Sequence, residues 1–415
     1  MEVRAFASQA PVLALDGASS AIASARRAVL ADRYAADALT VEWLDFAALE
    51  SNAGEWRALA ERALEPNVFY EPEFALAAAP VFGRSAGAHV VWSRKSPRRM
   101  LGFFPARIER RRYGLNMPVL VGWTHPFAPL GVPLVEHEAA EPIIAAWLAH
   151  LAADRSLPGL LLLPVLTAGG PFAAALETIV RRARMLEANF GRHRRAQLAP
   201  QRERARYVER ALGRHRHKEL RRQWRRLSET GAVLFPTARE PDAVAAALAD
   251  FFRLEACGWK GRGGTAAAQH DDLGGFMRAA VGALAAAGKV AIDRILVDGQ
   301  AIAATIILRS GRSAWFWKVA YDEDFARFSP GVMLTAVVTN ELVEDTTIMR
   351  TDSCATANHP MIDHLWRERL TLVNLLIAVR PQAPFAVARR LEGLRTAAIA
   401  GVKNVRDRLR GRLSR

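Results

Sequence analysis

The segment that begins at Val290 constrains the fold of this chain more than any other. Three β-rich runs follow one another across short turns, at residues 290–297, 301–308 and 313–320. Asp298-Gly299 lies between the first two runs and is a two-residue hairpin signal, because glycine adopts a positive φ without strain. The pattern predicts an antiparallel three-stranded meander.

The meander leads into a helix through Phe328-Ser329-Pro330-Gly331. Ser329 suits the N-cap, Pro330 suits the first helical position, and Gly331 leaves the backbone bare. A helix start presents free N–H groups to an anion, and Arg327 adds a positive charge nearby. We therefore predict a phosphate or pyrophosphate pocket here. An ordinary capped helix in a β-meander domain is the alternative interpretation.

The surrounding segments predict an alternation of strands and helices. Before the meander we expect a strand at 232–236 and helices at 242–256 and 271–287. After the pocket helix we expect a strand at 346–352, a short helix at 359–369 and a strand at 372–379. This order resembles that of the acyl-CoA-binding GNAT fold, with the phosphate loop between its fourth strand and third helix.

Length and composition exclude several classes of protein. A chain of 415 residues with 51% hydrophobic residues predicts two or three domains with buried cores. The sequence has no apolar run of about 18 residues, and residues 157–168 read as a buried strand. No secretion signal is expected. Two cysteines predict neither a disulfide framework nor a metal cluster, so a cytoplasmic location fits best, with peripheral attachment at the inner face of the membrane as an option.

The formal net charge of +15 favours contact with polyanions, which include CoA, nucleic acid and an anionic membrane. Arginine supplies most of this charge. An arginine- and alanine-rich composition is also expected from genomic base bias, which is the simpler explanation.

The order of elements predicts two related halves. We expect a loosely ordered leader at 1–38, a first unit at 39–205, a second unit at 206–382 and a basic tail at 383–415. The first unit shows helices, a hairpin expected from strands at 89–92 and 100–108, and a strand between two helices, which loosely repeats the second unit. Two such units side by side would bury a sheet edge and leave a cleft between them.

Two basic helices stand outside this repeat. Residues 214–231 combine Leu220, Trp224 and Leu227 at apolar spacing with many basic residues, so this helix is either a solvated connection or a wall that faces tRNA or the CoA 3′-phosphate. The tail from Phe385 has an apolar stripe within a basic surround. It is expected to lie on an anionic membrane, to dock on the protein's own surface, or to fray.

Four stretches of the second half resemble a bacterial GNAT-like family named after the cellulose-biosynthesis protein CelD. They are Lys218-Glu219-Leu220-Arg221-Arg222 through Gly231, residues 254–266, Tyr321-Asp322 through Gly331, and Asp352 followed by His359-Pro360 and Trp366. The first half resembles the same proteins through Trp56, Phe69-Tyr70, Phe74 and Phe104-Pro105. The resemblance implies an α/β fold of two tandem GNAT-like units, with mixed sheets flanked by helices and a basic C-terminal helix.

The resemblance also implies an acyltransferase with acyl-CoA, such as acetyl-CoA, as donor and no metal. The family is distantly similar to the FemAB aminoacyl transferases, which use aminoacyl-tRNA. This sequence departs from many relatives at residues 351–359, where a glycine-rich segment leading to Tyr-Lys is replaced and the lysine is absent. A catalytic role is therefore not transferred from that segment.

The resemblance to GNAT folds places the donor along the fourth strand and the pocket helix. The expected cofactor-binding residues are Trp317, Lys318, Val319, Arg327, Phe328, Ser329, Pro330, Gly331, Val332 and Met333. Amine acylation needs positioning, an oxyanion donor and a route for one proton. Asp352 is the first choice as base and His359 the second, with Tyr321 as proton donor to the leaving thiolate. The alternative roles are a turn cap for Asp352, a helix entry for His359 and a hydrophobic contact for Tyr321.

The acceptor is expected to contact the glycine-rich loop that follows the first long helix of the second half. The expected substrate-binding residues are Glu255, Trp259, Lys260 and Asp322. This loop lacks the spacing of a Walker loop, and a structural turn pinned by Trp259 is an equal alternative.

The leading hypothesis is an acyl-CoA-dependent N-acyltransferase acting on an amine of a small molecule or of an envelope or exopolysaccharide precursor. A FemAB-like transferase that uses aminoacyl-tRNA and a non-catalytic scaffold in polysaccharide synthesis are the alternatives.

Overall fold

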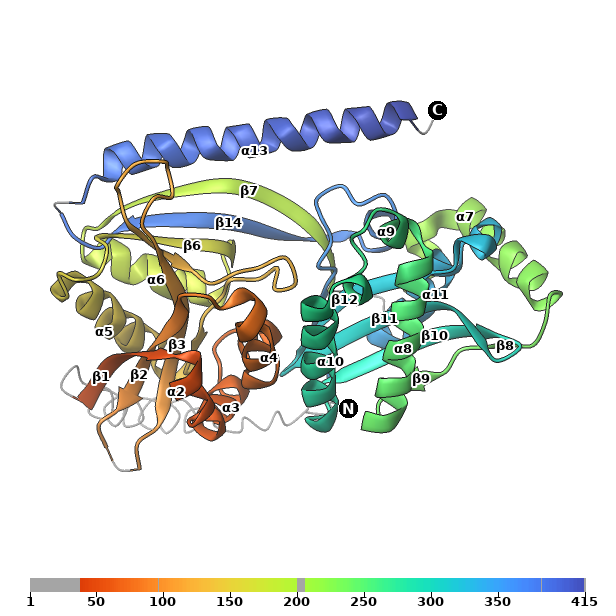
Figure 1. Cartoon of the computed structure of the whole chain (residues 1–415), viewed down its shortest axis with the longest axis horizontal. Helices are drawn as coiled ribbons and strands as arrows, with labels where there is room; N and C mark the ends of the chain where they lie inside the picture. Colours follow the sequence, from red (N-terminus) through yellow and green to blue (C-terminus); the bar gives the residue numbers. More distant parts are fainter. Residues whose placement is uncertain (1–37, 96, 200–205, 382, 414–415) are drawn as a thin grey trace, which may run out of the picture.

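The computed structural model describes residues 38–95, 97–199, 206–381 and 383–413 (Figure 1). The side chains of Trp259, Lys260, Ala400 and residues 402–413 are outside this description. The leader expected at 1–38 therefore lies almost wholly outside the described residues.

One mixed sheet of 14 strands runs through the molecule (Figure 1). The first half of the chain contributes β1 (Leu39–Asp45), β2 (Ala86–Ser93), β3 (Met100–Glu109), β4 (Val119–Gly122), β5 (Leu134–Val135), β6 (Leu160–Thr167) and β7 (Leu186–Leu198). The second half contributes β8 (Val233–Leu234), β9 (Thr237–Ala238), β10 (Val290–Val297), β11 (Gln300–Ser310), β12 (Ser313–Tyr321), β13 (Arg350–Asp352) and β14 (Glu368–Ala378).

Helices flank this sheet. Those of the first half are α2 (Phe46–Glu50), α3 (Ala53–Glu61), α4 (Pro72–Phe82), α5 (Ala140–Ala153) and α6 (Pro171–Arg182). Those of the second half are α7 (Tyr207–Ser228), α8 (Pro241–Cys257), α9 (Trp259–Arg262), α10 (Asp271–Ala286), α11 (Pro330–Glu344), α12 (Ile362–Leu365) and α13 (Phe385–Leu413). Short 3-10 turns complete the set, and η5 (Glu323–Phe328) is the one that precedes α11.

The two halves repeat one pattern. In each half, the last strand of an antiparallel meander is followed by a crossover helix and then pairs in parallel with a later strand. In the first half β4 pairs with β6 across α5, and in the second half β12 pairs with β13 across α11. A further helix and a last strand then follow: α6 and β7 in the first half, and α12 and β14 in the second. The predicted fold class of two related α/β units with mixed sheets is confirmed.

The last strand of each half pairs with a strand of the other half. The strand order across the centre is β6-β14-β7-β13, so β14 pairs with β6 of the first half and β7 pairs with β13 of the second. β14 and β7 also pair with each other over most of their length. This exchange makes the two halves one continuous sheet.

The largest hydrophobic core also crosses between the halves. The ring of Phe74, in α4, lies 5.5 Å from that of Phe276, in α10, and 5.6 Å from that of Trp317, in β12. Because these rings come from both halves, the packing that supports β12 depends on the first half as well as the second.

The predicted bounds of the meander agree closely with the structure, whereas the predicted bounds of the elements after it do not. β13 is much shorter than the strand expected at 346–352, and only α12, a single turn, forms within the helix expected at 359–369. The last strand begins at Glu368, because residues 368–371 pair with β7. The basic helix expected at 214–231 follows a kink at Gly213, where φ is 73°, and ends at Ser228. A shorter helical stretch from Tyr207 precedes the kink.

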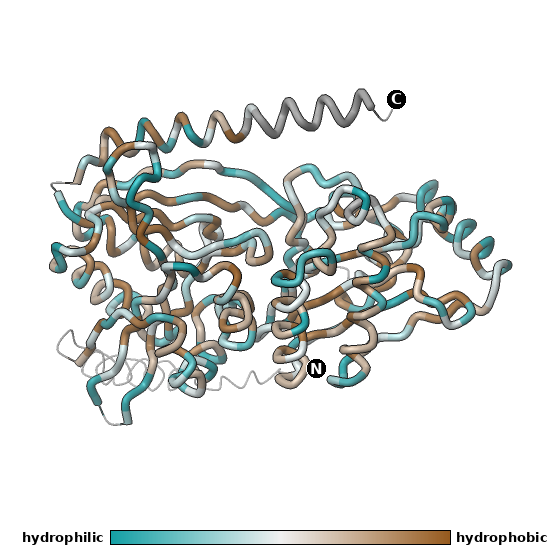
Figure 2. Tube along the Cα trace, viewed as in Figure 1, coloured by the Kyte–Doolittle hydropathy of each residue, from teal (hydrophilic) through white to brown (hydrophobic). Residues whose placement is uncertain are grey.

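Neither α4 nor β7 was predicted from the sequence. α4 carries Pro80 in its interior, and β7 has the hydrophilic sequence LEANFGRHRRAQL, which lacks a strand's apolar alternation. Figure 2 shows β7 as largely hydrophilic beside the hydrophobic β14. The ladder that β7 forms with β14 and β13 holds it in the sheet although its own side chains bury little apolar surface.

Candidate functional site

β12 and β13 separate after a short parallel contact. They pair from Ser313 to Trp315 on β12, opposite Arg350 to Asp352 on β13. β13 then ends, while β12 continues to Tyr321 with β11 as its strand partner. Its register with β11 shifts at this point, so that Trp317 is an additional residue on β12, which is a β-bulge.

A cavity of about 590 Å³ lies at this separation. Its walls are β12, the start of α11 and the chain that follows β13. The lining residues are Phe316, Trp317, Lys318, Val319, Tyr321, Ala326, Ser329, Gly331, Val332, Ser353, Cys354, Ala355, His359, Pro360, Met361 and Ile362. The backbone of β12 beyond Trp315 therefore borders a space that a ligand can enter.

The start of α11 forms one wall of this cavity. Pro330 and Gly331 are the first helical residues, and the carbonyl oxygen of Ser329 accepts from the N–H of Met333 at 3.0 Å. The N–H groups of Gly331 and Val332 lie in the first turn, where a helix supplies no backbone acceptor. Since no acidic side chain lies in this turn, the helix start favours an anion.

Ser329 takes the N-cap position, but not in the expected way. Its backbone is left-handed, with φ of 52° and ψ of 49°, and its side chain makes no capping hydrogen bond. Its N–H donates to the carbonyl oxygen of Ala326 at 2.9 Å, which closes η5. A non-glycine residue in this conformation is strained, and such strain gathers at ligand sites.

The ten residues expected to bind the cofactor fall into three groups. Those that line the cavity are Trp317, Lys318, Val319, Ser329, Gly331 and Val332. Phe328, Pro330 and Met333 are buried behind it, where they fix the position of the helix start. Arg327 is exposed, and its guanidinium lies 4.8 Å from the ring centre of Phe328.

The first half reaches this cavity through one loop. The Trp317 indole N–H donates to the carbonyl oxygen of Phe127 at 2.8 Å. The Lys318 ammonium lies 4.1 Å from the centre of the Phe127 ring, a cation–π contact. Phe127 could not be identified from its sequence pattern, because it lies in a loop between two short strands, β4 and β5.

His359 lines the cavity, but its ring is oriented by the backbone. Its Nδ1 accepts from the N–H groups of Met361 at 3.3 Å and Ile362 at 3.5 Å. Burial lowers the pKa of His359 below its ordinary value, and the nearby Asp363 opposes this only in part. A neutral imidazole that accepts at Nδ1 carries its proton on Nε2. At neutral pH His359 is therefore arranged to donate a hydrogen bond.

Asp352, the first choice as base, does not line the cavity. It is buried and forms an ion pair with Arg195 of β7, while its Oδ1 accepts from the N–H of Cys354 at 3.0 Å. Arg195 also donates to the carbonyl oxygen of Pro129 at 2.9 Å. The carboxylate thus positions the chain after β13, and it is not a free proton acceptor in this structure.

Cys354 lies next to this pair and lines the cavity. Burial, reinforced by the charge of Asp352, raises the pKa of its thiol above the ordinary value. The thiol therefore stays protonated at neutral pH and is a poor nucleophile.

The remaining predicted residues are divided between two places. Tyr321 lines the cavity beside β12, and its ring lies against Gly331, where an added Cβ would come within 3.1 Å of it. Glu255 lies with Tyr321 around a small separate hollow, and its Oε2 accepts from the N–H of Ala267 at 2.8 Å. Asp322 caps η5 by accepting from the N–H of Asp324 at 3.0 Å. The side chains of Trp259 and Lys260 lie outside the described residues.

The corresponding region of the first half is filled. The N–H of Gly131 donates to the carbonyl oxygen of Val165 at 3.0 Å, so the loop that follows β4 lies on β6. An added Cβ at Gly131 would come within 2.0 Å of the Pro164 oxygen. The crossover helix α5 also begins with Glu141 in its first turn, which repels anions. The open space beside β12 and the start of α11 therefore has no counterpart beside β4 and the start of α5.

No group of His, Cys, Asp and Glu side chains suited to a metal ion occurs within the described ranges. Among the helices described, none has the length and apolar character needed to cross a membrane.

Comparison with known proteins supports the fold. Residues 214–359 match the family described as "Acetyltransferase (GNAT) domain". No curated protein matches the chain.

Solved structures extend the similarity over both halves. The chain is similar to FemX, with a TM-score of 0.50 at 8% identity over 79% of this chain and 95% of that one. It is equally similar to the C-terminal domain of a candidate lysylphosphatidylglycerol synthetase from Agrobacterium fabrum, with a TM-score of 0.50 at 10% identity over 83% and 96%. A tandem GNAT protein from the clavulanic acid pathway matches with a TM-score of 0.41 at 12% identity over 83% and 99%.

Proposed function

We propose that this chain, which has a GNAT domain within a fold of two GNAT-like units, is an acyl-CoA-dependent N-acyltransferase with its donor site in the cavity between β12 and β13. The observation that carries the proposal is the opening of β12 beside the start of α11. The pyrophosphate would bind the N–H groups of Gly331 and Val332. The pantetheine arm would lie along the free edge of β12, as an added strand does.

The lining residues suit the transfer of an acyl group from a thioester to an amine. The amine nitrogen attacks the thioester carbonyl carbon, the carbon–sulfur bond breaks, and one proton passes from the amine side to the sulfur. The His359 Nε2–H is arranged to stabilise the developing oxyanion, and the Tyr321 hydroxyl donates its proton to the leaving thiolate. The Tyr321 oxygen regains a proton from the amine, which closes the cycle.

The acceptor would approach from the side of Tyr321 that borders the small hollow with Glu255. Glu255, Trp259, Lys260 and Asp322 are proposed to shape this side of the site. The proposed acceptor is an amine of a small molecule or of an envelope or exopolysaccharide precursor.

A second candidate function is transfer from aminoacyl-tRNA. It is favoured by α7, where Arg221, Arg225 and Arg226 are all exposed. Such a surface attracts a phosphate backbone. The likeness to FemX fits this reading and extends to the fold alone.

A thermal-shift screen separates the two donors. CoA, acetyl-CoA and longer acyl-CoAs are expected to raise the melting temperature through binding to the folded state, whereas tRNA at matched phosphate concentration is not. Stabilisation by tRNA that falls steeply with salt, with no response to any CoA thioester, would favour the second candidate.

A further inference from the structure

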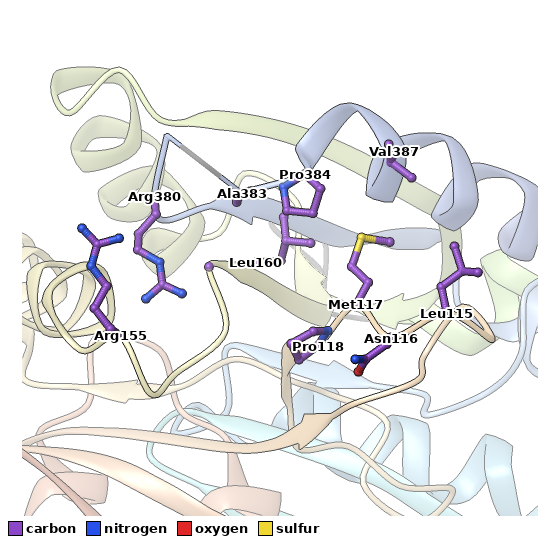
Figure 3. Close-up of a pocket in the computed structure, with 11 residues that line it drawn as sticks. Leu115, Asn116, Met117, Pro118, Arg155, Leu160, Arg380, Ala383, Pro384 and Val387 are labelled. Carbon is purple, nitrogen blue, oxygen red and sulfur yellow. The ribbon is translucent and has the colours of Figure 1, made fainter.

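A second large cavity lies in the first half, where the chain enters β4 and β6 and where α13 begins (Figure 3). Its volume is about 570 Å³, within the range of small-molecule sites. The lining residues are Leu115, Asn116, Met117, Pro118, Arg155, Gly159, Leu160, Arg380, Ala383, Pro384 and Val387. None of these residues belongs to the donor cavity.

One end of this cavity is cationic. Arg155 and Arg380 both lie at this end in Figure 3. The Arg380 guanidinium donates to the carbonyl oxygens of Asp154 at 2.8 Å and Leu157 at 2.6 Å, so neutral groups hold it in place. The Asp154 carboxylate accepts instead from the N–H and hydroxyl of Ser156. The charges of the two arginines are therefore available to an anion.

The other end is apolar and open to solvent. Met117, Leu115 and Val387 lie there (Figure 3), and the exposed fractions of Leu115 and Val387 are 52% and 50%. Leu394 lies two helical turns after Val387 on the same face of α13 and is 68% exposed. Arg390, between them on that face, is also exposed. Apolar side chains next to basic ones are typical of a surface that lies in a membrane interface.

The exposure of this face of α13 is fixed by how the helix docks. Phe385 and Ala388 are buried against the first half. Arg112 donates to both carboxylate oxygens of Glu392, at 2.9 and 3.0 Å, and Glu392 is 1% exposed. This buried bidentate ion pair holds the helix in one rotation, so Val387 and Leu394 must face outward.

We propose that this cavity binds the headgroup of an anionic phospholipid in a bilayer, with the phosphate between Arg155 and Arg380. The acyl chains would lie along Leu115 and Val387, and the surrounding face of α13 would rest in the interface. The two guanidinium groups more than balance the single negative charge of one phosphodiester, and the apolar rim favours a lipid over a free anion. The proposal concerns attachment and does not depend on the donor cavity.

Co-sedimentation with vesicles tests this site in the full chain. Vesicles of phosphatidylcholine with phosphatidylglycerol should bind the protein, and vesicles of phosphatidylcholine alone should not. Arg155→Gln changes an exposed residue and should weaken binding by about fivefold, the effect of one basic residue near an anionic surface. Leu115→Ser should weaken it further by removing rim contact.

The double variant Arg84→Gln/Arg312→Gln is the matched control, because both arginines are exposed and lie outside the cavity. It should bind vesicles at least as well as Arg155→Gln although it loses more charge. Equal binding by Arg155→Gln and the unaltered protein would overturn the proposal, and so would a larger loss in the control. If calorimetry showed that inorganic phosphate binds at this site while the protein binds no vesicles, the proposal that the ligand is a phospholipid would be overturned.

Discussion

At the scale of single residues, the buried pair of Arg195 and Asp352 shows how the two halves share one site. Each residue comes from a different half, and both are almost fully buried. Removing one partner of such a pair leaves an uncompensated buried charge, whereas an apolar replacement of both is tolerated. The carboxylate also accepts from the N–H of Cys354, so the pair sets the path of one cavity wall.

Asp352→Ala is expected to lower the free energy of unfolding by about 3–5 kcal/mol, because Arg195 loses its partner. The double variant Arg195→Met/Asp352→Leu should recover most of this loss. Urea denaturation measures both. If Asp352→Ala kept the stability of the unaltered protein but lost turnover, Asp352 would be a catalytic base and the positioning role would be wrong.

His359 gives a prediction in pH. Because burial lowers its pKa in the folded state, the unfolded state takes up the proton first as the pH falls below about 6.5. The stability that neutral His359 contributes is therefore complete above that pH and decreases below it. The difference in unfolding free energy between the unaltered protein and His359→Gln should shrink between roughly pH 7.5 and pH 5.5. A difference that grows over this range would contradict the neutral, backbone-oriented imidazole.

At the scale of elements, the meander and the helix after it were predictable because their signals are local. β10 begins and ends where the alternation of apolar residues and the Asp298-Gly299 turn place it, and α11 begins at Pro330 as expected. β7 was not predictable, because its sequence is hydrophilic and its place depends on pairing with strands far along the chain. Arg195 was missed with it, and so the partner of Asp352 could not be identified.

The start of α11 can be tested by removing one N–H group. Val332→Pro deletes this donor at a position in the first helical turn, where proline is tolerated. A hydrogen bond to a charged phosphate is lost, so the affinity for acetyl-CoA should fall by about tenfold or more. Val332→Ala keeps the N–H and should bind nearly as well as the unaltered protein. Equal affinities of the two variants in a calorimetric titration would exclude this N–H as a pyrophosphate donor.

At the scale of the whole molecule, the exchange of β7 and β14 makes the halves interdependent. β13 has β7 as its antiparallel neighbour, and β14 lies against β6. A second half cut at residue 206 would therefore lack β7 and leave β14 with two missing neighbours. Unpaired strand edges of this kind are prone to aggregation.

Residues 206–382 alone are therefore expected to show no cooperative unfolding transition, whereas the full chain should melt in a single one. A chain that begins at Leu186 restores β7 and is the matched comparison, expected to show partial recovery of structure. Circular dichroism during heating measures all three. A cooperative transition for residues 206–382 would show that the second half folds on its own and that the exchange is dispensable.

One open cavity lies beside the start of α11, where we propose that an anion binds, and the equivalent region of the first half is filled. Calorimetric titration of the full chain with acetyl-CoA tests this asymmetry and the donor site together. The expected result is one molecule bound per chain, with binding weakened by Val332→Pro and preserved by Val332→Ala. No binding of any CoA thioester, or two equivalent sites per chain, would contradict the account.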